Sequence, residues 1–278
     1  MKAIDLFRRL DRDFILPHLI DDWTEILDPT RYTDNFKKTW MGLALDNTDK
    51  IERIYTAVFA SKRTIEFLIA NDVRNAMLLT HHPMDWDITA DPVFQEITPA
   101  YLDELQARKI SLYNLHTPLD RVSDFSTSVT LAHALGANVL DSFGEFAVIA
   151  QTPAKTISEL KANFEKAIGH AAKLYPYGAS DNIDGGLVAF GAGGGNQPDL
   201  FPIMAARGVN TYIVGIAAVN DRPKSIAAHE AARQHQVNLI SGTHYSTEKF
   251  AMIKMGEYFA RLGLPCQFIE EAPCMEDM

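Results

Sequence analysis

The chain has little cysteine, no long hydrophobic run and no excess of positive charge. Its 278 residues include only two cysteines, Cys266 and Cys274, which we interpret as reduced thiols of a cytosolic protein and not as a disulfide framework. No apolar run approaches the roughly 20 residues that a membrane-spanning helix needs. Residues 1–9 carry charges among their apolar positions, which is typical of an amphipathic helix and not of a signal peptide. We therefore expect a cytoplasmic protein with no membrane partner.

Acidic residues outnumber basic ones. The chain has 36 aspartates and glutamates against 26 lysines and arginines, a formal net charge of −10 at pH 7. This balance argues against nucleic acid as a partner, because phosphate backbones attract basic surfaces. An anionic small-molecule substrate stays open, since bound cations can reverse the local field.

Several common catalytic motifs are also missing. No Gly-x-Ser-x-Gly sequence is present, so a nucleophile elbow is excluded. The run Gly193-Gly194-Gly195 lacks the Lys-Ser/Thr ending of a phosphate loop, and we interpret it as a strand-to-helix turn. His229 begins a zinc-protease-like pattern, but Arg233 stands where the second histidine is required.

Apolar strand-like runs alternate with helical patterns along the chain, which predicts an α/β protein with mainly parallel strands. Three of these runs, at residues 76–80, 109–115 and 237–240, lead directly into polar signatures. In open α/β sheets, ligands bind beyond the carboxyl ends of the strands. The placement of the signatures therefore predicts one shared functional site.

The three signatures supply imidazole and carboxylate groups and no thiol. They are Thr80-His81-His82-Pro83, His116-Thr117-Pro118-Leu119-Asp120 and His244-Tyr245-Ser246-Thr247-Glu248. This donor set suits a borderline-to-hard divalent metal, and its size suggests two ions. The absence of cysteine ligands favours Zn, Mn, Fe, Co or Ni without choosing among them.

Each signature taken alone also has an ordinary structural explanation. His81 and His82 would face opposite sides of a regular strand, so they could address two metals, or one could bind metal while the other forms a hydrogen bond. Alternatively, they form a polar strand end. Because Pro118 disfavours helical backbone at the preceding residue, we predict a turn after His116 that brings Asp120 back toward the strand end. A capped loop explains the same residues.

The third signature has the spacing of one helix face. His244 and Glu248 are four residues apart, which places their side chains on the same side of a helix. A carboxylate in the first turn of a helix also interacts favourably with the helix dipole. Glu248 could therefore be a metal ligand, including one shared by two ions, or simply a helix-stabilising charge.

In these residues the chain resembles the Nif-three-like family, whose members are also called GTP cyclohydrolase I type 2 homologues. The resemblance rests on residues 79–83, 116–120 and 242–248 in the family's order, with weaker similarity at residues 44–48 and 188–194. It extends over most of the chain beyond about residue 40. The chain departs from the family pattern at Pro118, where asparagine is usual, and at residues 214–217, where a polar segment is expected.

The resemblance implies two similar, intertwined α/β lobes with mixed, mainly parallel sheets and a metal site in the cleft between them. The implied metal ligands are His81, His82, Asp120, His244 and Glu248, with His116 nearby as an extra ligand or proton carrier. The family also suggests a homo-oligomer in the form of a toroidal hexamer. Because the signatures are far apart in sequence, we predict one lobe of residues 1–125 plus 240–278 and a second of residues 126–239.

The sequence thus leads to a hypothesis about function. We expect a cytoplasmic protein with two divalent metal ions per chain that hydrolyses a small nucleotide-like or phosphorylated compound, with His116 as its catalytic proton carrier. The alternative is a non-catalytic metal-binding protein with a regulatory or assembly role. A GTP cyclohydrolase is less favoured, since the sequence reveals no pocket that would read guanine.

Overall fold

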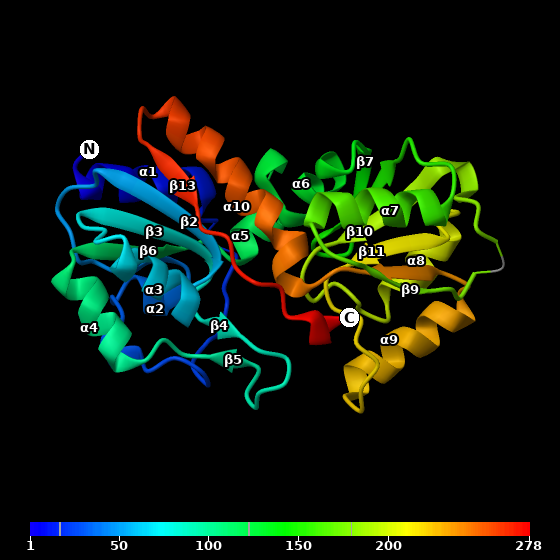
Figure 1. Cartoon of the computed structure of the whole chain (residues 1–278), viewed down its shortest axis with the longest axis horizontal. Coiled ribbons are helices and arrows are strands. Elements are labelled where there is room, and N and C mark those ends of the chain that lie inside the picture. The colour runs from blue at the N-terminus through cyan, green and yellow to red at the C-terminus, as the bar shows by residue number, and fades with distance from the viewer. Residues whose placement is uncertain (17, 122, 179) are drawn as a thin grey trace. The chain divides into compact units, whose positions relative to one another are not determined.

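The computed structural model describes residues 1–278 except Pro17, Val122 and Ala179 and divides the chain into two compact units (Figure 1). Unit 1 comprises Met1–Ser123 and Met252–Ala272, and unit 2 comprises Asp124–Ala251 and Pro273–Met278. The chain therefore begins in unit 1, passes into unit 2, returns to unit 1, and ends in unit 2.

Among the described residues, unit 1 is built on a five-stranded sheet with the order β1-β6-β3-β2-β13. Strands β6, β3, β2 and β13 are parallel to one another, and β1 at the edge runs antiparallel to β6. Two short strands form a separate antiparallel ribbon. The strands are β1 (Gly42–Leu45), β2 (Arg53–Phe59), β3 (Ala76–His82), β6 (Ile110–Asn114) and β13 (Cys266–Phe268), with β4 (Asp85–Trp86) and β5 (Phe94–Gln95) in the ribbon.

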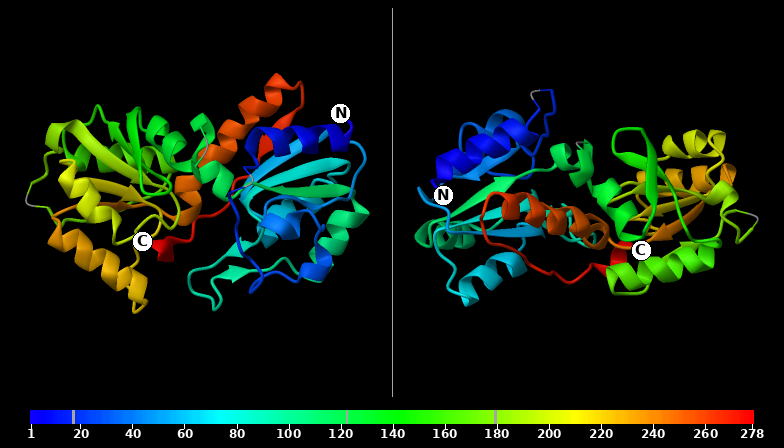
Figure 2. Two further views of the ribbon diagram at one scale, coloured as in Figure 1. Left: turned by 180° about the vertical axis from the view of Figure 1, so that it is seen from behind. Right: turned by 90° about the horizontal axis from the view of Figure 1, so that it is seen from above.

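Helices cover both faces of this sheet. In Figures 1 and 2, α1 and the end of α10 lie on one face, and α2, α3 and α4 lie on the other. Ser61 caps α3 by accepting a hydrogen bond from the backbone N–H of Thr64, as its sequence position predicts. The helices are α1 (Ala3–Phe14), α2 (Phe36–Thr39), α3 (Lys62–Ala70), α4 (Pro99–Ala107), α5 (Thr117–Arg121) and α10 (His244–Arg261).

Unit 2 contains a six-stranded sheet, within the described residues, in the order β7-β8-β10-β11-β12-β9. One apolar cluster packs α6 and α7 against the sheet, and another packs α8 and α9 against it. The strands are β7 (Asn138–Phe143), β8 (Ala147–Gln151), β9 (Lys173–Tyr175), β10 (Leu187–Gly191), β11 (Thr211–Val214) and β12 (Asn238–Ser241). The helices are α6 (Thr127–Ala134), α7 (Ile157–Ile168), α8 (Leu200–Ala206) and α9 (Pro223–Gln234), and short 3-10 turns occur at Pro29–Arg31, Ser123–Phe125, Asp184–Gly186 and Met275–Asp277.

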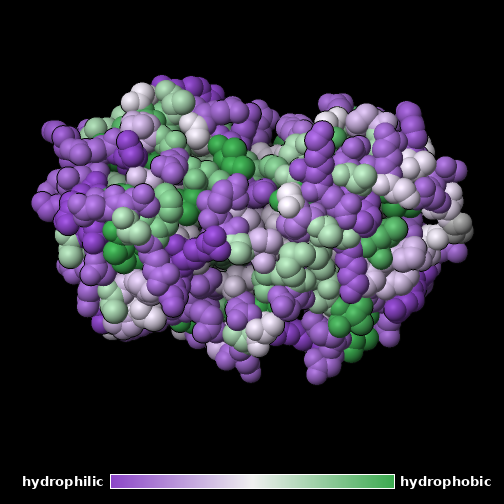
Figure 3. Space-filling model, viewed as in Figure 1, coloured by the Kyte–Doolittle hydropathy of each residue, from purple (hydrophilic) through white to green (hydrophobic). Residues whose placement is uncertain are grey.

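The predicted α/β class with mixed sheets is confirmed. Parallel pairing dominates in unit 1, whereas in unit 2 it joins β10, β11 and β12 at the centre and antiparallel strands flank them. The hairpin of β7 and β8 explains part of this difference, because Gly144 supplies the positive φ of a tight turn between them. The visible surface of each unit is mainly hydrophilic with small scattered apolar patches (Figure 3).

Within the described residues, no helix combines the length and the apolar character that crossing a bilayer requires.

A buried carboxyl group, Glu271, holds the segment after β13 in unit 1. It accepts hydrogen bonds from the Ser61 hydroxyl and from the backbone N–H of Phe59. Burial raises the pKa of Glu271 to about 7, compared with about 4.3 in an unfolded chain. The folded protein therefore keeps this proton where the unfolded chain loses it. The stability that results is fully present below about pH 4 and is lost as the pH rises to about 7.

Replacing Glu271 with glutamine should remove this pH dependence. Between pH 5 and pH 8, we expect the free energy of unfolding of the wild type to fall by about 2 kcal/mol more than that of Glu271→Gln. Urea unfolding of both proteins at the two pH values, with metal chelated, measures the difference. Identical falls in the two proteins would contradict the assignment.

Candidate metal centre

Unit 1 gathers three histidines at the carboxyl ends of β3 and β6. Strand β3 continues through His81 and His82, because His82 still pairs with Phe59 of β2, and His116 lies two residues beyond the end of β6. One ring nitrogen from each histidine lies within 4.8 Å of the others. His81 and His82 are buried, and His116 is partly exposed. Three imidazoles packed this closely can hold a divalent ion in common.

The orientation of His81 is fixed by a backbone group. Its Nδ1 lies 2.9 Å from the carbonyl oxygen of Leu115, and since that oxygen can only accept, Nδ1 carries the proton. The other ring nitrogen, Nε2, lies 3.6 Å from Asp120 Oδ1. A carbonyl that fixes the tautomer in this way is a common support for a metal-binding imidazole.

The turn predicted after His116 is wrong, because residues 117–121 form the short helix α5. Pro118 is tolerated there because the first N–H groups of a helix have no partner within the helix. The helical spacing still places His116 Nε2 and Asp120 Oδ2 3.9 Å apart. Asp120 therefore lies beside His81 and His116, in a helix and not in the predicted turn.

A carboxylate that the sequence did not reveal, Asp21, orients His116. Its Oδ1 lies 3.1 Å from His116 Nδ1, and the Thr117 hydroxyl donates to the same oxygen. Although burial opposes ionisation, the His116 ring holds the pKa of Asp21 below its usual range. Burial also opposes protonation of His116, but Asp21 raises the pKa of that imidazole. Asp21 thus fixes one nitrogen of His116 and leaves Nε2 facing Asp120.

Replacing Asp21 with alanine should weaken the site without unfolding the protein. Loss of a group that supports a metal ligand typically costs about 10–100-fold in metal affinity or activity, and we expect a loss in this range. Metal titration of Asp21→Ala measures it, with Asp22→Ala as the matched control. Asp22 is the neighbouring aspartate, and among the described residues its side chain forms hydrogen bonds only with Thr24. Equal affinities in the two variants would refute the role of Asp21.

Aromatic rings surround the histidines of unit 1. The ring of Phe59 stacks on His82 with centroids 4.9 Å apart, and Phe94 lies 5.4 Å from the same imidazole. Trp23 contacts His116 edge-on at 5.2 Å. These rings shield the imidazoles from bulk water, which strengthens electrostatic interactions inside the site.

Unit 2 contributes the pair His244 and Glu248 at the start of α10. Thr243 begins this helix by accepting a hydrogen bond from the backbone N–H of Ser246. His244 Nε2 lies 3.1 Å from Glu248 Oε1, and both side chains are about 5% exposed. The helical spacing predicted from sequence is therefore present, and it joins an imidazole to a buried carboxylate.

The glycine-rich loop after β10 packs against this pair. Gly193 has a φ of +62°, and a Cβ atom there would lie 2.0 Å from Glu248 Oε1. The Thr247 hydroxyl accepts a hydrogen bond from the Gly193 N–H. The sequence interpretation of residues 193–195 as a simple turn missed this close approach, in which only glycine leaves room for the Glu248 carboxylate.

A second unpredicted carboxylate, Asp277, caps the helix that carries the pair. Its Oδ2 accepts a hydrogen bond of 2.8 Å from the backbone N–H of His244. The side chain is fully buried, and its backbone oxygen accepts hydrogen bonds from the N–H groups of Ala217 and Ala218. Asp277 therefore links the start of α10 to the segment after β11 and fixes the backbone of His244.

We expect Asp277→Ala to lower the free energy of unfolding by about 1–2 kcal/mol, the usual cost of a lost helix cap. It should also weaken metal binding, since His244 loses its fixed backbone position. Asp277→Asn retains an acceptor and should recover part of both losses. Denaturant unfolding and metal titration measure these effects, with the exposed Glu276→Ala as control. The capping role fails if Asp277→Ala matches that control.

The donor chemistry of both groups fits divalent metal ions. In unit 1, His81, His82 and His116 lie together with Asp120 beside them, and in unit 2 His244 lies against Glu248. These groups are borderline-to-hard nitrogen and oxygen donors. Asp21 and Asp277 escaped the sequence analysis because each lies far along the chain from the histidine that it supports.

This chain matches the model of one protein family, and it shares its fold with a solved structure. The family model described as Duf34/NIF3 (NGG1p interacting factor 3) matches residues 19–274. A "GTP cyclohydrolase 1 type 2 homolog" of Pyrococcus horikoshii is 27% identical over 272 residues, covering 94% of this chain and 98% of its own length. One of the same name from Deinococcus radiodurans is 26% identical, covering 82% of this chain and 83% of its own.

A solved structure, TTHA1606 from Thermus thermophilus, shares the fold with a TM-score of 0.69. It is 21% identical in sequence, and the match covers 98% of this chain and 99% of that one.

Proposed function

Since the chain belongs to the DUF34/NIF3 family, we propose that it is a cytoplasmic hydrolase with two divalent metal ions, acting on a small phosphorylated or nucleotide-like compound. The observation that carries the proposal is the group His81, His82 and His116, whose ring nitrogens lie within 4.8 Å of one another. Unpaired cationic imidazoles would repel at this spacing, whereas neutral imidazoles around a cation attract it.

We further propose that His81, His82, Asp120, His244 and Glu248 serve a single dinuclear centre. Two bound ions would polarise the scissile bond and lower the pKa of water. The two carboxylates, Asp120 and Glu248, would offset the positive charge of the ions. The imidazoles would complete the set of ligands as neutral donors.

His116 is proposed as a proton carrier or as an additional ligand. Asp21 holds its Nδ1 proton, so Nε2 is the atom that would accept or release a proton or contact an ion. Trp23 limits the motion of the ring by its edge contact. A carrier held in one orientation transfers protons more effectively than a mobile ring.

A turnover screen tests the proposed hydrolase. The tag-free, metal-loaded protein should hydrolyse at least one member of a panel of phosphomonoesters, phosphodiesters and nucleotides, and chelation should abolish this activity. Metal binding without turnover of any substrate would favour the non-catalytic alternative. Release of formate from GTP would instead support a cyclohydrolase.

Light scattering of the same protein tests the expected homo-oligomer. A toroidal hexamer predicts six chains per particle.

A further inference from the structure

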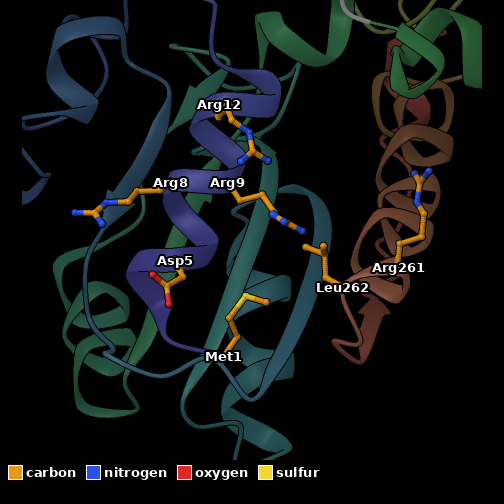
Figure 4. Close-up of a pocket in the computed structure, with 7 residues that line it drawn as sticks. All are labelled: Met1, Asp5, Arg8, Arg9, Arg12, Arg261 and Leu262. Atoms are coloured by element: carbon orange, nitrogen blue, oxygen red, sulfur yellow. The ribbon is translucent and has the colours of Figure 1, made fainter.

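The outer side of α1 carries a stripe of arginines. The helix buries one face against the sheet through Ala3, Leu6, Phe7, Leu10 and Phe14. Asp5, Arg8, Arg9 and Arg12 follow the spacing i, i+3, i+4, i+7 on the remaining surface, so their backbone positions share one side of the helix. From there the Arg9 side chain extends toward Leu262, and the Arg8 side chain extends the other way (Figure 4).

The stripe lines a hollow in unit 1. The hollow has a volume of about 490 Å³, and its lining includes Arg261 and Leu262 at the end of α10. Figure 4 shows Arg9 extending from α1 toward Leu262, with Arg12 nearby and Arg261 on α10. The volume lies within the range of about 300–1,000 Å³ that is usual for small-molecule sites.

Contacts between α1 and α10 fix the shape of the hollow. The Tyr258 hydroxyl of α10 donates a hydrogen bond of 2.7 Å to Asp13 Oδ2. The Phe14 and Tyr258 rings meet edge-on with centroids 5.2 Å apart. Because the two helices are held together without a ligand, binding there would require little reordering.

The charge in the hollow is unbalanced. Four arginines line it, against Asp5 in the lining and Asp13 beside it. Arg12 already pairs with Asp13, whereas Arg8 and Arg9 form no ion pair with any residue that the structure describes. The whole chain has a net charge of −10. This local concentration of positive charge therefore differs from the mixed charges of an ordinary solvated helix face.

The residue type narrows the ligand class. All four cationic side chains are arginines, whose planar guanidinium groups bind phosphate oxygens through two parallel hydrogen bonds. Met1 and Leu262 add apolar surface to the same hollow. We propose that this hollow binds a phosphate-bearing small molecule of nucleotide size.

This site is separate from the metal-binding histidines. The Met1 amino group donates to the Ile51 carbonyl just before β2, and the Pro265 carbonyl accepts from Ile54 at the start of the same strand. These contacts place the hollow toward the amino end of β2. His82 pairs with Phe59 at the carboxyl end of that strand.

Calorimetric titration with ADP and with inorganic pyrophosphate, in the presence of chelator, tests the proposal. Chelation removes any phosphate binding to metal ions. At an ionic strength near 0.15 M, we expect ADP to bind with a dissociation constant below about 1 mM, and the double variant Arg9→Gln, Arg261→Gln to weaken binding at least tenfold. Arg63→Gln, at an exposed arginine of α3, is the matched control and should bind like the wild type.

Several results would overturn the proposal. They are the absence of ADP binding at 1 mM, equal binding by the double variant and the wild type, and equal weakening in Arg63→Gln. Unchanged melting temperatures would show that the variants remain folded. Binding of pyrophosphate as tight as that of ADP would support the site and assign recognition to the phosphates. Weaker binding of pyrophosphate than of ADP would also support the site, and it would assign part of the recognition to the nucleoside.

Discussion

Glu248→Ala is expected to remove about one of two bound metal ions per chain and to reduce metal-dependent turnover by more than about 100-fold. Loss of a group that supports a metal ligand typically lowers metal affinity or activity by about 10–100-fold. Loss of a ligand itself should lower them further. The reason lies in the position of Glu248, which is buried with Oε1 3.1 Å from His244 Nε2. Removing its carboxylate deletes both a donor and a negative charge that would offset the ions.

The same variant distinguishes the two interpretations of Glu248. If the carboxylate only complemented the helix dipole, Glu248→Ala would lose about 0.3–1 kcal/mol of stability and leave the metal content unchanged. Elemental analysis and denaturant unfolding separate these outcomes. Glu257→Ala is the control, because Glu257 lies on the same helix but is exposed and pairs with Lys254. Full metal content in Glu248→Ala would refute its role as a ligand.

Gly193→Ala should destabilise unit 2 by about 2–4 kcal/mol and weaken metal binding. Part of the loss is the strain of a side chain at positive φ, about 1–2 kcal/mol. The rest comes from overpacking, since the new Cβ would lie 2.0 Å from Glu248 Oε1. The carboxylate must then leave its position beside His244.

Two other glycines separate these contributions. Gly208 has a φ of +72°, and nothing lies within 4 Å of the position that a Cβ atom would take, so Gly208→Ala measures backbone strain alone. Gly194 has open space without a positive φ, and Gly194→Ala should be almost neutral. Thermal unfolding and metal titration of the three variants give the comparison. If Gly193→Ala lost no more than Gly208→Ala, the close packing of Glu248 would be contradicted.

Local patterns predicted much of the fold. The apolar runs that lead to His81 and His116 form strands, and Ser61 caps its helix as its sequence position predicts. These features follow from residues that are neighbours in sequence, where periodicity and capping act directly. The α/β class followed from the same alternation, whereas the mixed sheets were implied by the family resemblance.

The supporting groups of the candidate site could not be predicted in this way. Asp21 reaches His116, and Asp277 reaches the backbone of His244, through contacts that only the folded chain creates. Neither aspartate belongs to a motif or to a periodic pattern. The helix at residues 117–121 could not be predicted for a different reason. Pro118 disfavours helical backbone at its predecessor, but proline is also tolerated in the first turn of a helix, and the local sequence does not decide between the two effects.

The metal content of the tag-free protein tests the central claim most directly. Elemental analysis after incubation with Zn, Mn, Fe, Co or Ni salts and removal of free ions should give about two ions per chain. The double variant His81→Ala, Glu248→Ala should then retain much less than one. Wild-type protein that holds less than one ion per chain, with the same content in the double variant, would contradict the account.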